Sequence, residues 1–412
     1  MAVRPRSSVA QMDGSPPRRY YTGRNLERAR AIADLRARTH RLMPRFVLEY
    51  LEGGAGEEAT VRREREAFAE WRFQPHILVD ESNRSTKRDI LGREAAMPLA
   101  IAPTGLNALF LHRGDTALAQ GAARMGVPYI QSTMSNDSIE RVAEIEGLRH
   151  WWQLYVFGGE EVWQELLRRA DAAGCEALVL TTNAQIFGDR EWNSRTRYPG
   201  GWPTLAAMLD AARHPRWAAA TVAHGMPEFS NVIDFVPKDK RSFFDSATWI
   251  REQMPKTLSW DDVARIRARW PKPFFVKGLL NLEDVRRARD SGVDGIILGS
   301  HGGRQMDWAV SALDILPEAR EIVGGATALY MSGGIRHGTD IIKALALGAD
   351  AVLTGRAALY GLCAGGADGV YRALDILRKQ MMNELGQAGM ASLDALSPAL
   401  LRHMPRIPVP VV

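Results

Sequence analysis

Short apolar segments recur along the chain and are separated by segments with helical periodicity. The apolar segments show no alternation of polar and apolar residues, which is typical of parallel strands that are buried on both faces. The segments between them, such as Asp115–Met125 and Glu161–Ala173, carry apolar residues three and four positions apart, as amphipathic helices do. The pattern therefore predicts eight strands, at residues 97–103, 127–132, 151–157, 177–182, 273–278, 295–300, 327–333 and 351–356.

Eight strands that alternate with helices predict an α/β fold in which the strands close into a (β/α)8 barrel, the TIM barrel. Two additions to the bare barrel are expected: an N-terminal helical extension within residues 25–70, and a long insertion after the fourth strand, at about residues 195–258. A connection of this length is usually a lid, a docking surface or a disordered insert. Residues 1–24 are rich in Pro, Arg and Ser and are predicted to form a disordered arm, so that residues 25–405 make up one barrel domain.

Composition narrows the class of protein. The chain has 412 residues, of which 46% are hydrophobic, and no apolar run is long enough to span a bilayer, so we expect a soluble, cytoplasmic enzyme. The net charge of +5 is modest and the acidic residues are interleaved with the basic ones, which argues against a nucleic-acid partner. Cys175 and Cys363 alone suggest neither a disulfide framework nor a metal cluster. The expected partners are small acidic molecules or an anionic membrane surface.

Polar residues gather at the carboxyl ends of the predicted strands, where barrel enzymes hold their active sites. His301 follows the strand at 295–300, and two glycines after it let the backbone approach a ligand closely. With Arg304 three residues on, this turn indicates a catalytic base beside an anion clamp; the alternative is a hydrogen-bonded histidine next to a surface arginine. Further strand-end residues suggest the lining of a polar ligand site: Thr104, Gly105, Ser132, Gln153, Tyr155, Thr181, Asn183 and Lys277.

The turns after the last two strands predict a phosphate site. They read SGGIRHG and TGRA, and Gly334, Arg336, Gly355 and Arg356 can direct backbone N–H groups and guanidinium groups at a dianion. Lys277 ends an apolar strand, and a fixed ammonium there would stabilise negative charge on an electron-accepting ring. A flavin with a phosphate tail satisfies both features. No Gly-x-Gly-x-x-Gly turn leads from a strand into a helix, so a nicotinamide dinucleotide is not supported.

Several segments together resemble the FMN-dependent 2-hydroxy acid dehydrogenase and oxidase family, and within it the mandelate-oxidising members. They include YLEGGA, MPLAIAPTGLN, FFVKGLL, HGGRQMD and GTDIIKALALGADAVLTGRAALYGL, and the likeness runs from about residue 30 to residue 400. The resemblance implies that FMN is the cofactor and that a 2-hydroxy acid with an aromatic or bulky side chain is oxidised to the 2-oxo acid. Whether hydride or carbanion transfer is used stays open.

The resemblance also implies roles for individual residues. His301 would be the base, Arg190 and Arg304 would clamp the substrate carboxylate, Tyr155 would contact the substrate, and Lys277 would lie beside flavin N1 and O2. The remaining flavin contacts would be made by Thr104, Gly105, Ser132, Gln153 and Thr181, and the phosphate would be held by Gly334, Arg336, Gly355 and Arg356.

Four positions depart from the family's pattern. Leu48 stands where a substrate-binding tyrosine is expected, and Asn183 stands where an aspartate accompanies the histidine. Ser300 replaces an asparagine, and Ser332 replaces an aspartate that supports the ribityl chain. An uncharged partner at Asn183 should lower the pKa of His301. The departures leave open a flavin-binding protein with weakened catalysis, or an FMN oxidase of another α-substituted carboxylate or of a peptide end.

The resemblance also bears on the electron acceptor and the assembly. Gly105 follows Pro103 and Thr104 as in the mandelate-oxidising members, whereas oxygen-using relatives tend to carry alanine, which implies a quinone or another acceptor in place of O2. The aromatic and basic residues 217–244 could form a solvated lid or touch a membrane surface, so peripheral association with the inner membrane face is an alternative to a purely cytoplasmic location. The family implies a homo-oligomer, expected to be a tetramer.

Overall fold

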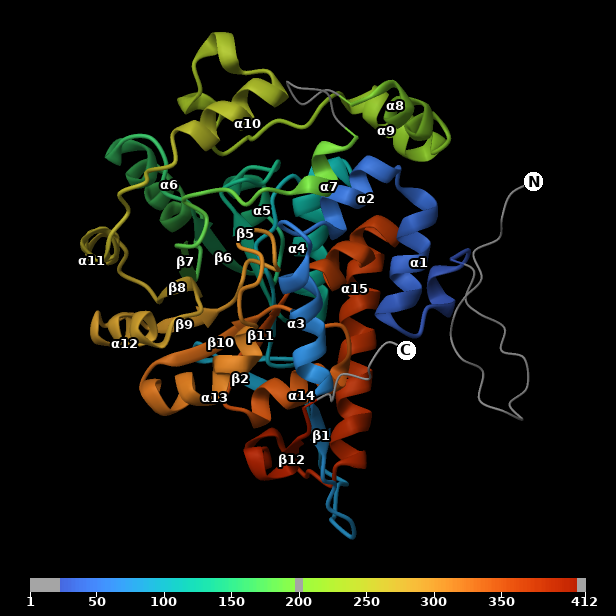
Figure 1. The fold of residues 1–412 in the computed structure, drawn as a ribbon, viewed down its shortest axis with the longest axis vertical. Coiled ribbons are helices and arrows are strands. Elements are labelled where there is room, and N and C mark those ends of the chain that lie inside the picture. Colours follow the sequence, from blue (N-terminus) through green and yellow to red (C-terminus); the bar gives the residue numbers. More distant parts are fainter. Residues whose placement is uncertain (1–22, 197–202, 406–412) are drawn as a thin grey trace.

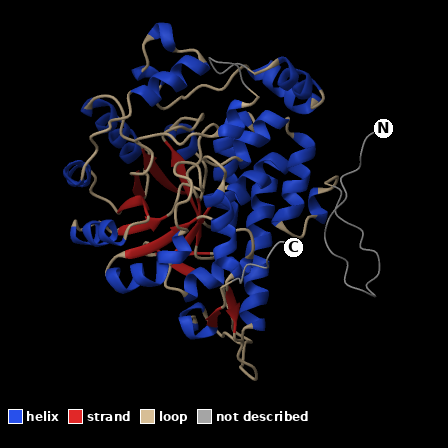
Figure 2. Ribbon diagram, in the orientation of Figure 1, coloured by secondary structure: helices blue, strands red, loops and turns tan. Residues whose placement is uncertain are grey.

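The computed structural model describes residues 23–196 and 203–405, so most of the predicted N-terminal arm lies outside the described residues. Eight parallel strands form a barrel at the centre of the molecule (Figure 2). The barrel is closed, and its strands follow the order β10-β11-β4-β5-β6-β7-β8-β9. Each predicted apolar segment overlaps one strand, which confirms the (β/α)8 barrel. The strands are β4 (Leu99–Ile101), β5 (Pro128–Ser132), β6 (Arg149–Leu154), β7 (Ala177–Thr181), β8 (Phe274–Leu279), β9 (Gly295–Leu298), β10 (Ala328–Ser332) and β11 (Ala351–Thr354).

Helices surround the barrel and bury the apolar faces that their sequences present. The last of them is bent, because Gly365 and Gly366 depart from helical backbone angles within it. The surrounding helices are α4 (Gly114–Met125), α5 (Ile139–Ala143), α6 (Glu160–Ala172), α11 (Trp260–Arg269), α12 (Leu282–Asp290), α13 (Ala312–Val323), α14 (Gly338–Ala346) and α15 (Arg356–Gln387).

The interior of the barrel is filled, so the functional site lies at one of its ends. The rings of Trp151, Phe275 and Tyr330 pack against one another with centroids 5.2 to 6.3 Å apart. A short hairpin, β2 (Arg88–Ile90) with β3 (Arg93–Ala95), adds Ile90 and Ala95 to this cluster. A second small sheet pairs β1 (Trp71–Phe73) with β12 (Leu401–His403).

The predicted helical extension precedes the barrel and covers one side of it (Figure 1). It consists of a 3-10 turn at Leu26–Arg28 and of α1 (Ile32–Leu42), α2 (Arg45–Glu52) and α3 (Ala59–Ala69). Leu35, Val47 and Phe68 are buried in the core. The end of α2 is fixed to the barrel because the guanidinium of Arg304 donates hydrogen bonds of 2.7 Å to the carbonyls of Tyr50 and Gly53.

The insertion between β7 and β8 is helical in its described part and packs over the carboxyl ends of the strands (Figure 1). Phe229, Val232 and Ile250 are buried, so this segment has a core of its own that continues into the barrel. Its elements are α7 (Glu191–Ser194), α8 (Leu205–Ala212), α9 (Pro215–His224), 3-10 turns at Ile233–Phe235 and Lys238–Lys240, and α10 (Phe243–Glu252).

Candidate active site

A cavity of about 380 Å³ lies at the carboxyl end of the barrel, within the size range of small-molecule sites. Its walls come from the barrel turns, from α2 and from the insertion, so segments distant in sequence meet there. Most of the predicted site residues line it: Thr104, Gly105, Ser132, Tyr155, Arg190, Lys277, His301, Arg304, Gly334, Arg336, Gly355 and Arg356.

Three predicted site residues lie behind the cavity wall. Gln153 is buried and its Oε1 accepts a 2.9 Å hydrogen bond from Ser132, while its Nε2 has no partner among the described residues. Thr181 is buried beside Lys277 on the neighbouring strand, and its hydroxyl is also without a described partner. Asn183 lines a neighbouring cavity and reaches His301 from the other side.

Hydrogen bonds orient the imidazole of His301. Its Nδ1 lies 3.2 Å from Oδ1 of Asn183, and its Nε2 lies 3.2 Å from the hydroxyl of Tyr155. The amide of Asn183 donates through Nδ2 to the carbonyl of Gly299 at 3.1 Å, so its oxygen faces the histidine and accepts. This arrangement places the proton on Nδ1 and leaves the Nε2 lone pair on the cavity side.

The environment keeps His301 neutral. Burial is the main cause that lowers the pKa of His301 well below its usual range, and the positive charges of Lys277, Arg190 and Arg304 lower it further. A lowered pKa of His301 is what an uncharged Asn183 predicts, but its main cause is the burial of the ring. Burial also raises the pKa of Tyr155, so its hydroxyl keeps its proton and can donate to Nε2.

Two arginines face the same cavity from different segments. Arg190 precedes α7 and is held by hydrogen bonds of 3.1 Å to the carbonyl of Arg304 and 3.3 Å to Gln305. The guanidinium of Arg304 lies 5.0 Å from the ring centre of Tyr50. Burial and the charge of Arg190 lower the pKa of Arg304, but a guanidinium stays protonated in proteins. The pair forms a positively charged wall beside His301.

Leu48 does not contribute to this cavity. It packs against the hydrophobic core, and Tyr50, about half a helical turn further on, lines the cavity. The hydroxyl of Tyr50 donates a 3.3 Å hydrogen bond to the carbonyl of Gly105. The substrate-side position of this helix is therefore 50 and not 48, because the orientation of α2 points Tyr50 at the cavity.

Lys277 and Glu64 are two buried ionisable residues, of which sequence reasoning recognised only Lys277. Lys277 is 3% exposed. Burial lowers the pKa of Lys277 to about 8, and Glu64 acts in the opposite direction. Glu64, on α3, is 2% exposed and accepts a hydrogen bond from Ser300. Nothing in the charged sequence of α3 distinguishes Glu64 from its exposed neighbours.

The turns after β10 and β11 form a cradle for an anion. Gly355 caps the N-terminus of α15, where backbone N–H groups and the helix dipole favour negative charge. Arg356 and Arg336 face the cavity, and burial lowers the pKa of both. A Cβ on Gly355 would meet Ala102 and Thr104 at 3.8 Å, an ordinary van der Waals distance, so the backbone of this turn is not crowded.

The residues present fit FMN. Buried positive charges without a compensating ligand are costly, and here Lys277, Arg336 and Arg356 surround one cavity. The unpartnered polar atoms of Gln153 and Thr181 lie in the adjacent wall, as expected of groups that complete their hydrogen bonds with a bound ring. The phosphate would be held by the two turns, and the ring would lie beside Lys277.

The fold and the site together define a flavin-type oxidoreductase of the TIM-barrel class. The profile of the FMN-dependent dehydrogenase family matches residues 39–403, and the chain belongs to this family. The predicted family and cofactor are thereby confirmed.

Individual relatives agree with this assignment. The chain is 40% identical to (S)-mandelate dehydrogenase of Pseudomonas putida, over 90% of this chain and 93% of that protein. It is 33% identical to L-lactate dehydrogenase of Caulobacter sp. strain K31, over 91% and 99%. A solved structure described as the monotopic membrane protein (S)-mandelate dehydrogenase superposes with a TM-score of 0.87 at 40% identity, covering 91% of this chain and all of that one. The chain is an FMN-dependent enzyme that oxidises the CH–OH group of a 2-hydroxy acid, as predicted.

Proposed function

We propose that this enzyme oxidises an aromatic, mandelate-like 2-hydroxy acid to the 2-oxo acid, with His301 as the base. The observation that carries the proposal is the orientation of His301, whose unprotonated Nε2 faces a cavity that also presents Arg190 and Arg304. The 40% identity to a mandelate dehydrogenase supports the aromatic substrate.

The two arginines bind the substrate carboxylate. Guanidinium groups form paired, charge-assisted hydrogen bonds with a carboxylate, and their positions on opposite segments fix its orientation. The hydroxyls of Tyr155 and Tyr50 lie in the same wall and contact the α-hydroxyl or the carboxylate. The alternative substrates are another α-substituted carboxylate or a peptide end, and no relative described above supports either of them.

The apolar part of the cavity accommodates the substrate side chain. The segment between β7 and β8 contributes Phe187, Phe229 and Ile250 to this part of the cavity. The barrel turns contribute Leu106 and Met134. An aromatic ring would bury apolar surface against these residues, at roughly 25 cal/mol per Å². A small side chain such as that of lactate would leave part of this surface uncovered.

Proton transfer is assigned to His301. Because its pKa is held low, the imidazole is neutral at pH 7 and accepts the substrate proton at Nε2. Asn183 holds the Nδ1–H and keeps the ring oriented. FMN held by the turns after β10 and β11 would supply the acceptor for the two electrons that leave the substrate α-carbon. Lys277 would stabilise the negative charge that this adds near the ring.

The insertion supports a proposal of peripheral membrane association. No helix among the described residues has both the length and the apolar composition needed to cross a bilayer. On α8, α9 and the following turn, however, Leu205, Leu209, Val222 and Met226 are 50 to 87% exposed. These elements protrude together at one end of the molecule (Figure 1), and the relative with the TM-score of 0.87 is described as monotopic.

A membrane position suits a quinone as the electron acceptor, with the enzyme attached to the inner membrane face from the cytoplasm. Gly105 lines the cavity, and a Cβ there would lie 2.8 Å from Met134, so alanine would crowd this wall. We keep the tetramer as the expected homo-oligomer, on the family resemblance alone.

Anaerobic stopped-flow absorbance tests the substrate proposal. The purified holoenzyme is mixed with (S)-mandelate, phenyl-lactate, lactate and glycolate, and bleaching of the oxidised flavin is recorded. We expect mandelate or phenyl-lactate to reduce the flavin at least tenfold more efficiently than lactate. Preference for lactate or glycolate would refute the aromatic substrate, and no bleaching by any of the four would favour a flavoprotein with weakened catalysis.

A further inference from the structure

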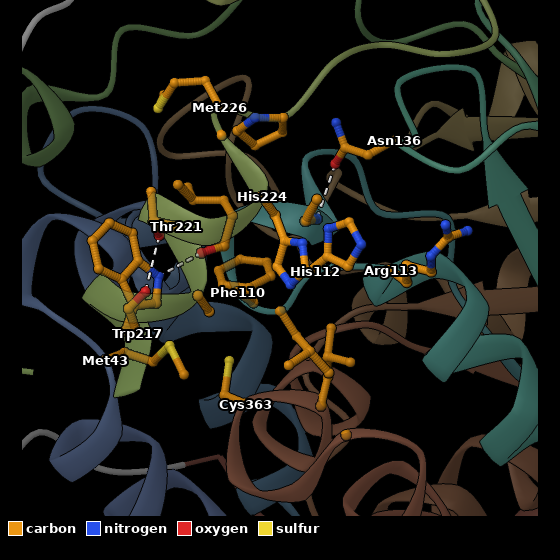
Figure 3. A pocket seen from close by; sticks show the side chains of 18 of the residues that line it. Met43, Phe110, His112, Arg113, Asn136, Trp217, Thr221, His224, Met226 and Cys363 are labelled. Atoms are coloured by element: carbon orange, nitrogen blue, oxygen red, sulfur yellow. Dashed lines mark hydrogen bonds between the residues drawn. The ribbon is translucent and has the colours of Figure 1, made fainter. Parts of the chain in front are cut away.

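A second, larger cavity lies between the insertion and the barrel (Figure 3). It has a volume of about 990 Å³ and is lined by α9, by the turn before α4 and by residues 362–366 of α15. Leu42, Met43, Phe46, Trp217, Phe243 and Leu362 make most of its wall apolar. Cys363 is buried at its inner end. A cavity of this size and composition fits a small-molecule ligand.

This cavity is a built part of the fold. The indole of Trp217 donates a 2.8 Å hydrogen bond to the carbonyl of Leu109 and packs edge-on against Phe46, which fixes α9 on the barrel. The amide of Asn136 donates a 2.8 Å hydrogen bond to the carbonyl of Glu228, which fixes the turn after α9. The walls therefore keep their separation without a ligand.

Aromatic side chains lie between this cavity and the candidate active site. Phe110 lines both cavities. On the active-site side it packs against Tyr50, with ring centroids 6.0 Å apart. Beside it, Phe229 of the active site stacks on Phe243 of the second cavity, with centroids 5.9 Å apart and planes 7° apart. A molecule in the second cavity would lie one aromatic layer from the flavin site.

The mouth of the cavity is polar. His112 and His224 stack there with ring centroids 3.7 Å apart, and Arg113 is adjacent (Figure 3). Burial, together with the charges of His224 and Arg113, lowers the pKa of His112, so its ring is neutral and offers one N–H donor and one acceptor. The cavity therefore combines apolar walls with hydrogen-bond donors at one end.

We propose that this cavity binds the quinone that reoxidises the flavin. A quinone has an apolar ring and tail and carbonyl oxygens that accept hydrogen bonds, which matches apolar walls with a histidine pair at the mouth. Met208 of α8 and Met226 after α9 line the cavity and are each 50% exposed, so an acceptor dissolved in a membrane would enter beside them. The inference rests on the proposed acceptor, and it adds the site that the acceptor occupies.

The transfer balances without another reagent. Reoxidation would take two electrons and two protons from the reduced flavin, and these protons would leave on the active-site side. The quinone would gain two electrons, together with two protons from solvent, to become the quinol. The electrons cross the aromatic wall at Phe110. Protons exchange with solvent at the mouth, where the histidine pair holds hydrogen bonds to the quinone and quinol oxygens.

Two alanines on α9 provide a matched pair of variants. Ala220 lines the cavity, whereas Ala219 is exposed on the same helix and does not. In Ala220→Trp, the indole occupies the cavity. We expect a loss of at least tenfold in reoxidation of the holoenzyme by a benzoquinone with one isoprene unit. Flavin reduction by substrate and reoxidation by ferricyanide should stay within twofold of wild type, and Ala219→Trp should match wild type in all three reactions.

Binding is measured separately with an azido-benzoquinone that labels the protein on illumination. We expect labelled peptides from residues 108–113 and 215–230, with labelling reduced by Ala220→Trp. Equal quinone reoxidation in both tryptophan variants, or labelling confined to the active-site cavity, would overturn the inference. A wild-type enzyme that is reduced by substrate and reoxidised by ferricyanide but by no quinone would instead refute the proposed acceptor, and the inference with it.

Discussion

Glu64 Oε1 accepts a 2.5 Å hydrogen bond from the hydroxyl of Ser300, while Oε2 has no partner among the described residues. The carboxylate lies against Gly333, where any Cβ would overlap it. Ser300 bonds this carboxylate and Ser332 precedes Gly333, and both serines depart from the family's pattern. A buried carboxylate contributed by α3 thus stands beside the turn from which the aspartate at position 332 is missing.

The ionisation of Glu64 should make stability depend on pH. Burial raises the pKa of Glu64 to about 7, whereas the unfolded chain loses this proton near its ordinary value of 4.5. Between these values the unfolded state binds fewer protons, so the free energy of unfolding should fall as the pH rises from about 5 to 7, by up to about 3 kcal/mol. In Glu64→Gln this fall should disappear. Urea unfolding of the FMN-free protein at several pH values measures it.

The matched control is Glu66→Gln, since Glu66 is exposed on the same helix. It should keep the pH dependence of the wild type. If Glu64→Gln retains the same slope between pH 5 and 7, another group is responsible for the pH dependence.

The strands and most of the site could be predicted because their signals are local. A strand buried on both faces must be apolar throughout, and the carboxyl ends of barrel strands meet whatever the sequence between them. Glu64 was missed because the charged residues of α3 resemble a solvent-exposed helix face. Its contacts with Ser300 and Gly333, which are distant in the sequence, make it internal. Tyr50 was missed because the rotation of α2 about its axis is set by tertiary packing.

His301→Gln should abolish reduction of the flavin by substrate. Glutamine can still occupy the space and contact Asn183, but it cannot accept a proton, so the rate should fall by at least a factor of about 10² to 10⁴. The absorbance spectrum of bound FMN should be nearly unchanged. Anaerobic stopped-flow with mandelate measures the rate, and reduction by dithionite serves as the control. A variant that bleaches as fast as wild type would exclude His301 as the base.

Arg304→Lys should weaken substrate binding although the charge is kept. A lysine ammonium cannot reproduce the two parallel hydrogen bonds of a guanidinium, and it would also release the carbonyls of Tyr50 and Gly53. Loss of one charge-assisted hydrogen bond is worth about 1.5 to 3 kcal/mol, so KM should rise roughly tenfold or more. Arg62→Lys, at an exposed position of α3, is the control. An unchanged KM would remove Arg304 from the proposed clamp.

Membrane binding should depend on α8 and α9. Leu209 and Val222 are 59% and 87% exposed, and burial of each in a bilayer interface would contribute about 1.5 to 3 kcal/mol. The double variant Leu209→Asp/Val222→Asp should therefore no longer sediment with anionic liposomes. Ile77→Asp/Leu78→Asp changes residues that are 80% and 100% exposed in the loop after β1, at the opposite end of the molecule (Figure 1), and should sediment like wild type. Equal loss in both variants would argue against docking through the insertion.

Asn183→Asp should raise the pKa of His301. A carboxylate 3.2 Å from Nδ1 would favour the imidazolium, by about one to three pH units. In the wild type, burial and nearby cations keep the neutral base available to low pH, so the rate of flavin reduction should be nearly flat between pH 6 and 8. In the variant, protonation should reduce the rate on the acid side at a higher pH than in the wild type.

At pH values above this acid limb, flavin reduction in the Asn183→Asp variant should be more than tenfold faster than in the wild type. The reason is that the carboxylate stabilises the imidazolium that forms when His301 takes the substrate proton. The comparison is made on mandelate by stopped-flow from pH 5 to 9, with Asn183→Ala as the variant that removes the hydrogen bond altogether. If Asp and Asn give the same rate and the same pH profile while Ala is slower, Asn183 positions the ring of His301 and its lack of charge is immaterial to the chemical step.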